Sequence, residues 1–354
     1  MSVAARSEWY YTDSVEVHHA TNEWSCFLPS NRYNYLDSMP QPTKSSVRVA
    51  FQGEHGAFSE AAAMQLLGES IKTIPRPTFD SAFRAIAEGA ADALLAPVEN
   101  SLAGSVVRVY DLLLESNLAI VAETILPIEH HLIGCPGATL AGLKSVASHP
   151  MALAQCERFF LSHPALKRVP AEDTAGSVRD VLASGDKSCA GVAGRQAATR
   201  YGGIILSESI QDNAENFTRF VLLIPAQGDA FLDSANSVPA SSSAVRELMT
   251  QFRVRRRDNQ SESTKTLKLS LALKLAHKPG ALLAALEPFA RHGINLLKIE
   301  SRPIHGSPWE YQFFLDVQTE DPTHLKQALN ELAPATSFLR VLGAYPPASS
   351  DSLS

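Results

Sequence analysis

The sequence predicts an α/β protein in which a large region of alternating strands and helices precedes a smaller βαββαβ module. Between Val47 and about Pro225, short apolar runs alternate with amphipathic segments, which is typical of α/β folds with largely parallel sheets. From Leu267 onward, apolar and polar residues alternate at a period of two, which indicates half-buried strands. With 354 residues, the chain is long enough for two domains.

The expected elements of the first region follow one another in order. Thr78 is a plausible N-cap of a helix that ends at Gly89, and Pro150 suits the first position of a later helix. The remaining predicted elements are strands over 47–51, 93–96, 190–193 and 204–206, a helix over 105–115 and a helix that ends at Gly202. In the second region we expect strands over 267–275, 294–301, 309–317 and 338–342 and helices over 280–291 and 323–332. This βαββαβ order is ferredoxin-like, with two helices on one face of an antiparallel sheet.

Composition limits the kinds of partner. The net charge of −6 predicts no general attraction to nucleic acid or to anionic membranes, and no stretch approaches the ~18–20 apolar residues that span a bilayer. The four cysteines are scattered, which favours reduced thiols and a cytoplasmic protein over disulfides or a zinc site. The expected organisation is an extension over 1–46, an α/β region over 47–225, a serine-rich linker over 226–265, a module over 266–345 and a tail over 346–354.

The most informative stretch is Asn216–Phe220, which precedes the apolar run Val221–Ile224. A threonine hydroxyl that donates a hydrogen bond and an arginine fork that matches a carboxylate stand side by side at Thr218 and Arg219. Together they suit a substrate that carries carboxylates and loses an oxygen. The alternative is that Asn216 and Thr218 only begin the strand while Arg219 extends to solvent.

Four polar clusters follow predicted strands, where open α/β sheets bind ligands. They are Gly53–Glu60, Pro97–Gly104, Ser148–Pro150 and Asp173–Gly176. Capping of the next helix would explain any one of them, but their number favours a pocket. The glycine spacing does not fit a dinucleotide or phosphate loop, and no nucleophile elbow supports Ser148 beside His149 as a hydrolase dyad. Adjacent side chains in Glu129-His130-His131 point in opposite directions, so we expect a satisfied or exposed histidine there and not a metal site.

Over essentially its full length, Val47–Pro225 resembles the catalytic domain of the prephenate/arogenate dehydratases. The matching segments are Pro97–Gly104, Ser148–Cys156, Asp173–Gly176 and Asn216–Phe220. The C-terminal module resembles an ACT regulatory domain in Lys278–Leu282 and Ile299–Pro303. Two positions depart from the family pattern: Met151, where glutamine is usual, and Leu297, where a small hydroxyl residue is commoner.

The resemblance implies two lobes with a periplasmic-binding-protein-like fold and the substrate between them. The implied reaction converts prephenate to phenylpyruvate, with loss of carbon dioxide and water and without a metal or organic cofactor. Thr218 would donate to the departing hydroxyl and Arg219 would neutralise a carboxylate. The implied substrate-binding residues are Glu99, Asn100, Ser101, Ser148, His149, Thr174, Asn216 and Phe220.

For the ACT module, the resemblance implies binding of L-phenylalanine between paired subunits of a homodimer or homotetramer. The implied effector-binding residues are Gly280, Ala281, Leu282, Asn295, Glu300, Ser301 and Arg302. Two alternatives remain open. The substrate could be arogenate, or the chain could be a non-catalytic amino-acid-binding regulator, because both folds are ligand-binding scaffolds.

Overall fold

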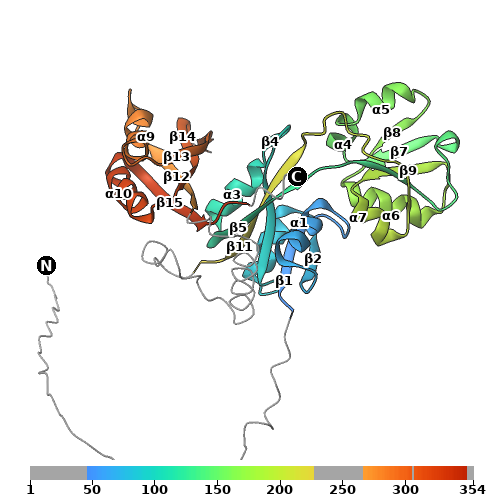
Figure 1. The fold of residues 1–354 in the computed structure, drawn as a ribbon, viewed down its shortest axis with the longest axis horizontal. Helices are drawn as coiled ribbons and strands as arrows, with labels where there is room; N and C mark the ends of the chain where they lie inside the picture. Colours follow the sequence, from blue (N-terminus) through green and yellow to red (C-terminus); the bar gives the residue numbers. More distant parts are fainter. Residues whose placement is uncertain (1–45, 227–265, 305–306, 349–354) are drawn as a thin grey trace, which may run out of the picture. The chain divides into compact units, whose positions relative to one another are not determined.

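The computed structural model describes residues 46–226, 266–304 and 307–348 (Figure 1). Of the expected extension over 1–46 and linker over 226–265, only Ser46 and Ala226 are among these residues, and of the expected tail over 346–354 only 346–348 are. None of the described helices is long and apolar enough to cross a membrane.

The α/β region consists of two lobes, each built on its own sheet (Figure 1). The first lobe contains β1 (Arg48–Gln52), α1 (Phe58–Leu67), β2 (Lys72–Arg76), α2 (Phe79–Ala87), β3 (Ala93–Asn100), β4 (Gly104–Ser105), α3 (Val107–Glu115), β5 (Leu118–Pro127) and β11 (Phe217–Pro225). The second contains β6 (His131–Gly134), η1 (Leu140–Gly142), β7 (Ser145–Ser148), α4 (Pro150–Ala154), α5 (Glu157–Ser162), β8 (Lys167–Pro170), α6 (Thr174–Ser184), β9 (Cys189–Ala193), α7 (Arg195–Tyr201) and β10 (Ile204–Ser207). The chain therefore enters the second lobe after β5 and returns through β11.

The C-terminal module has the predicted βαββαβ order. Its elements are β12 (Leu267–Leu275), α9 (Ala281–Arg291), β13 (Asn295–Ile304), β14 (Ser307–Thr319), α10 (Pro322–Leu332), η2 (Ala333–Ala335) and β15 (Thr336–Tyr345). The strand order β13-β14-β12-β15, with antiparallel neighbours, is ferredoxin-like. The predicted fold class of two α/β lobes followed by this module is confirmed.

The local signals that defined the helices are confirmed in detail. The Thr78 hydroxyl accepts a hydrogen bond from the backbone of Ser81 at 3.1 Å, and the Ser81 side chain completes a capping box. Pro150 occupies the first position of α4, and Gly202 ends α7 in the left-handed conformation.

The prediction of largely parallel sheets is confirmed in both lobes, and the exceptions are β11 and the two-residue β4 in the first lobe and β6 in the second. In the first lobe β1 is parallel to β2 and β3, but β11 is antiparallel to both β3 and β5. In the second lobe β7 is parallel to β8 and β9, whereas β6 is antiparallel to β9 and β10. The antiparallel strand β11 runs back from the second lobe into the first, and a return of this kind is not visible in strand–helix alternation alone.

Strand β11 presents different residues to two apolar cores. Phe220, Leu222 and Ile224 pack with residues of α1 in one core. Val221 and Leu223 pack in the other core, which also contains Tyr345 and further residues of the C-terminal sheet. One face of β11 is therefore covered by α1 and the other by residues from α2, α3 and the C-terminal module.

Burial of the C-terminal sheet differs from the expectation of half-buried strands. In β12, Leu269, Leu271 and Leu273 pack against α9 and α10 as expected. The polar face is also buried, since Lys268 is 7% exposed and Ser270 is 3% exposed. The physical reason is that this second face packs against the first lobe and not against water.

Candidate active site

Two consecutive rungs of the β3–β11 ladder organise the candidate site. Thr218 lies opposite Asn100, and Arg219 lies opposite Glu99. Because side chains alternate along a strand, neighbouring rungs direct their side chains to opposite faces of the sheet. The Thr218–Asn100 rung therefore contributes the side chains of the candidate site, and the Arg219–Glu99 rung directs its side chains to the opposite face of the sheet.

The orientation of the Asn100 amide is determined by its surroundings. Its Oδ1 accepts hydrogen bonds from the backbone N–H groups of Leu102 at 3.0 Å and Ala103 at 2.8 Å. The Nδ2 group must consequently face the other way, where it donates to Thr218 Oγ1 at 2.9 Å and to Asn216 Oδ1 at 2.7 Å. The Thr218 oxygen is thus an acceptor from Asn100, which leaves its own hydrogen free to point elsewhere.

The same network continues into the second lobe. Asn216 is 1% exposed, and its Nδ2 donates to Oε1 of Gln155 at 3.1 Å. Gln155 caps the end of α4, so this bond joins the second lobe to the strand that carries Thr218. Since Gln155 Oε1 can only accept, His130 Nε2 must be the donor in the 2.9 Å contact between them.

His130 and Gln155 were not identified as site residues from the sequence. His130 was expected to be a satisfied or exposed histidine, but it is 2% exposed and its Nδ1 has no partner among the described residues. Burial of the ring lowers its pKa, which favours the neutral form. The only available sequence signal was the position of Gln155 inside the Ser148–Cys156 match.

Ser101 serves the backbone of the site. Its hydroxyl donates to the Glu215 carbonyl and accepts from the Phe217 N–H, both at 2.9 Å. It therefore fastens the β3–β4 turn to the start of β11. The structure thus brings together four of the predicted residues, which are Asn100, Ser101, Asn216 and Thr218.

The three predicted residues of the second lobe make local contacts. Ser148 is fully buried and donates to the Val192 carbonyl at 2.6 Å. Exposed His149 caps α4, its Nδ1 accepting from the Met151 N–H at 3.2 Å. Half-buried Thr174 begins α6, and no hydrogen bond of its hydroxyl is found among the described residues. The capping alternative holds for His149, and Thr174 keeps a free hydroxyl.

Three other predicted residues lie away from the Thr218 hydroxyl. Phe220 is 2% exposed within the core against α1. Arg219 and Glu99 occupy the opposite face of the sheet, where Arg219 binds Glu123 and Asp316. Thr218 and Arg219, which we expected to act side by side on one substrate, therefore lie on opposite faces of the sheet, because strand alternation separates adjacent side chains.

The electrostatic environment of Arg219 favours the ionised forms of Arg219 and Asp316. Burial would lower the pKa of the guanidinium, but interactions with Tyr345, Asp316 and Glu123 raise it well above its ordinary value. Burial would raise the pKa of Asp316, but Arg219 and Lys268 lower it below its ordinary value. Both groups are consequently ionised at neutral pH.

The predicted effector residues divide into separate groups. Gly280, at φ 80°, caps α9, and Ala281 and Leu282 form its first turn. Asn295 begins β13, about 20 Å along the strand from Ser301 at ~3.3 Å per residue. Glu300 contacts Ser105 of the first lobe, and Arg302 lies 3.9 Å from Asp111. Glu300 and Arg302 thus face the first lobe, whereas alternation directs Ser301 to the other face.

Comparisons with known proteins agree with this architecture. The family model described as prephenate dehydratase matches residues 49–227, and the ACT domain model matches residues 270–334. Arogenate dehydratase/prephenate dehydratase 1, chloroplastic, from Arabidopsis thaliana is 36% identical over 317 residues, which is 85% of this chain and 72% of that protein.

Two solved structures are also similar. The prephenate dehydratase of Arthrobacter aurescens in complex with L-Phe has a TM-score of 0.69 and 30% identity, with 86% of this chain and 91% of that chain covered. GqqA, described as a novel type of quorum quenching acylase, has a TM-score of 0.70 and 31% identity, with 86% of this chain and 99% of that chain covered.

Among the described residues, no group of three or more His, Cys, Asp or Glu side chains could hold a metal ion.

Proposed function

Because this chain belongs to the prephenate dehydratase family, we propose that Thr218 and Asn100 stabilise the departing oxygen of prephenate. In the reaction, the bond between the ring and its carboxylate breaks and carbon dioxide leaves. The electron pair of that bond enters the ring, and the ring hydroxyl leaves with the pair of the carbon–oxygen bond and takes a proton from solvent to become water. Aromatisation drives the reaction, so the enzyme chiefly orients the dianion and assists the leaving oxygen.

The observation that carries this proposal is the hydrogen bond from Asn100 Nδ2 to Thr218 Oγ1 at 2.9 Å. Because the oxygen is held as an acceptor, the hydroxyl hydrogen is available to the substrate. A threonine hydroxyl is too weak an acid to act as a strong proton donor. It instead donates a hydrogen bond to oxygen that becomes negative as the carbon–oxygen bond breaks, which is electrostatic stabilisation of the transition state.

Substrate contacts are proposed from both lobes. Asn216 and Gln155 join the lobes next to Thr218, so a substrate at this junction can be held from both sides. Thr174 at the start of α6 has no hydrogen-bond partner for its hydroxyl among the described residues, so it is available to the substrate. Ser148 and His149 stay proposed as substrate-binding residues on the second lobe. We leave Arg219, Glu99 and Phe220 out of the proposed substrate site, because Arg219 and Glu99 contact the C-terminal module and Phe220 lies in the core against α1.

Dehydration fits the site better than acyl transfer, the activity in the description of GqqA. Acyl transfer by a hydroxyl nucleophile needs an adjacent base. No histidine or carboxylate is hydrogen-bonded to the hydroxyl of Thr218, Ser101 or Ser148 among the described residues. We propose prephenate as the substrate, with arogenate as the alternative, no cofactor, and a cytoplasmic location.

We further propose that phenylalanine regulates the enzyme through the ACT module, which is a small-molecule effector domain. The separation of Asn295 from Ser301 along β13 is too great for one amino acid to touch both in a single subunit. We therefore propose that two subunits share the effector site in a homodimer, or in a homotetramer that contains it, with Asn295 of one subunit near the Gly280–Leu282 turn of the other.

The chemistry is tested by Thr218→Val and Thr218→Ser. The valine variant should lose about 10²–10³ in kcat on prephenate with little change in KM, as expected for a donor that acts in the transition state. The serine variant keeps the hydroxyl and should retain most activity. Circular dichroism checks folding, and parallel assays on arogenate decide the substrate. A folded valine variant with parent kcat would remove Thr218 from the mechanism, and absence of turnover on both substrates would favour a non-catalytic regulator.

A further inference from the structure

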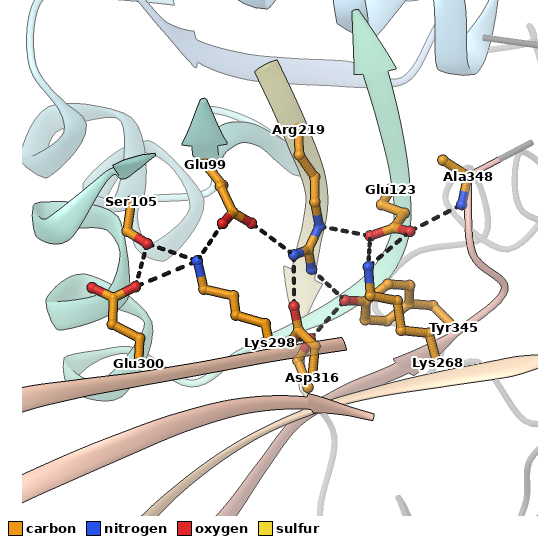
Figure 2. Close-up of polar contacts among 11 residues, drawn as sticks. Glu99, Ser105, Glu123, Arg219, Lys268, Lys298, Glu300, Asp316, Tyr345 and Ala348 are labelled. Atoms are coloured by element: carbon orange, nitrogen blue, oxygen red, sulfur yellow. Dashed lines mark hydrogen bonds and ion pairs between the residues drawn. The ribbon is translucent and has the colours of Figure 1, made fainter. Parts of the chain in front are cut away.

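Behind the candidate site, a buried polar network joins β3 and β11 to the C-terminal sheet (Figure 2). Arg219 is its centre: Nε donates to Glu123 Oε2 at 2.8 Å, Nη1 to Asp316 Oδ2 at 2.6 Å and Nη2 to Tyr345 OH at 3.0 Å. Glu123 belongs to β5, whereas Asp316 and Tyr345 belong to β14 and β15. The guanidinium therefore has partners in both modules.

The other members of this network hold the partners of Arg219 in place. Lys268 of β12 lies 2.9 Å from Glu123 (Figure 2). Ser270 forms hydrogen bonds with both Asp316 and Tyr345. Only 2% of the Glu123 side chain and 5% of the Asp316 side chain are exposed. Removing one charge from such a group leaves another buried without compensation, so its geometry depends on every member.

Glu99, which lies opposite Arg219 on β3, makes the second connection. Lys298 Nζ of β13 lies 2.9 Å from Glu99 Oε1 and donates to Ser105 Oγ at 2.6 Å (Figure 2). Ser105 in turn bonds Glu300, the next residue of β13 on the same face. Both residues of the Glu99–Arg219 rung are thus held by the C-terminal sheet.

This rung is adjacent to the one that bears the proposed chemistry. Peptide bonds connect Glu99 to Asn100 and Arg219 to Thr218, so a shift of either charged side chain changes the backbone that places the donor. A donor displaced by about 1 Å can cost about 100-fold in rate. Strand alternation therefore allows the Asn100–Thr218 rung to face the substrate while the neighbouring Glu99–Arg219 rung contacts the C-terminal sheet.

We propose that Glu99 and Arg219 are positioning residues, through which the C-terminal sheet sets the alignment of the Asn100–Thr218 pair. This inference rests on the proposed roles of Asn100 and Thr218. The same contacts connect the proposed effector site to the substrate site. Ser301 is next to Glu300 on β13, and Glu300 and Lys298 contact the first lobe. An effector that binds differently to two positions of this sheet would change the rate without touching the substrate.

The test uses Asp316→Asn and Lys298→Gln in the full-length chain. Each removes one charge from the C-terminal side of the network and leaves the substrate-facing residues unchanged. Glu331→Gln is the matched control, because Glu331 pairs with Arg291 and His292 on the exposed side of the same module. Lys298 is less enclosed by buried charge than Asp316, so it covers the case in which Asp316→Asn fails to fold.

The expected result is a loss of kcat on prephenate of about 10- to 100-fold, with KM changed less than about twofold. The ratio of rates with and without phenylalanine should also change by about 2- to 30-fold, while the control keeps parent values. Folded Asp316→Asn and Lys298→Gln proteins with the kcat of the control would overturn the proposal, even where Thr218→Val remains inactive. If the parent does not respond to phenylalanine, the effector route is excluded and kcat alone decides the positioning role.

Discussion

Thr218 and Arg219 are adjacent in sequence but face opposite sides of β11: the Thr218 hydroxyl lies 2.9 Å from Asn100, whereas the Arg219 guanidinium lies 2.6 Å from Asp316. The first contact belongs to the face where we place the substrate, and the second to the face that meets the C-terminal sheet. One short motif therefore contributes to two separate surfaces.

The amide of Asn100 provides a direct test of the hydrogen-bond directions. Asn100→Asp keeps the size of the side chain and its acceptor for the turn, but the group that faces Thr218 can no longer donate. The Thr218 hydrogen should then turn toward the carboxylate and away from the substrate. We expect kcat to fall at least about 10²-fold, the loss typical of a missing transition-state donor.

Steady-state kinetics on prephenate checks this expectation. The control is Asn213→Asp, since exposed Asn213 only accepts from the Glu215 N–H, a role that a carboxylate also fulfils. Normal turnover by a folded Asn100→Asp enzyme at neutral pH would show that the direction of this bond does not matter.

His130 should make stability depend on pH. Burial lowers its pKa below the ordinary 6.5, so the unfolded chain takes up a proton at higher pH than the folded protein does. As the pH falls below about 6.5, protonation therefore favours the unfolded state, and stability decreases until the lowered pKa is reached. His130→Gln keeps a donor for Gln155 and removes this titration.

Urea unfolding between pH 7.5 and about 5 measures the effect. His130→Gln should lose stability less steeply than the parent as the pH falls, although His131, whose pKa burial also lowers, retains its share. His277→Gln, at an exposed position, should follow the parent. Identical slopes for parent and His130→Gln would show that His130 does not contribute.

Gly343 tests the packing of the C-terminal sheet on the first lobe. It lies opposite Ile120 of β5, and a Cβ added there would overlap the Ile120 carbonyl oxygen. Because backbone cannot yield as a flexible side chain does, Gly343→Ala should destabilise the protein by about 1–3 kcal/mol. Thermal unfolding should show this loss, and Gly142→Ala, which meets only the Thr139 side chain, should not. Equal melting temperatures for the two variants would indicate that Gly343 and the Ile120 backbone are not tightly packed.

Local patterns predicted most elements because their signals are short-range. Thr78, Pro150 and Gly202 act on the backbone within a turn, and each had the expected effect. The apolar–polar alternation of β12 was equally visible. The packing partner of the polar face of β12 was not visible in the sequence, because Lys268 contacts Glu123, which lies 145 residues away in the chain.

The candidate site shows the same division. Asn100, Ser101, Asn216 and Thr218 were predicted to belong together and do so, while Arg219, Glu99 and Phe220 were assigned to the same pocket and lie elsewhere. His130 and Gln155 entered the network only through contacts between segments far apart in the chain.

The sequence by itself determined the residue types, the strand periods and the family to which the chain belongs. Only the tertiary structure decided which face of β11 and β3 meets the proposed substrate site and which meets the C-terminal sheet. The physical reason is that alternation is fixed by backbone geometry within two residues, whereas the Thr218–Asn100 rung joins residues 118 positions apart. That register, and the modules packed on either side of it, depend on contacts that no local pattern encodes.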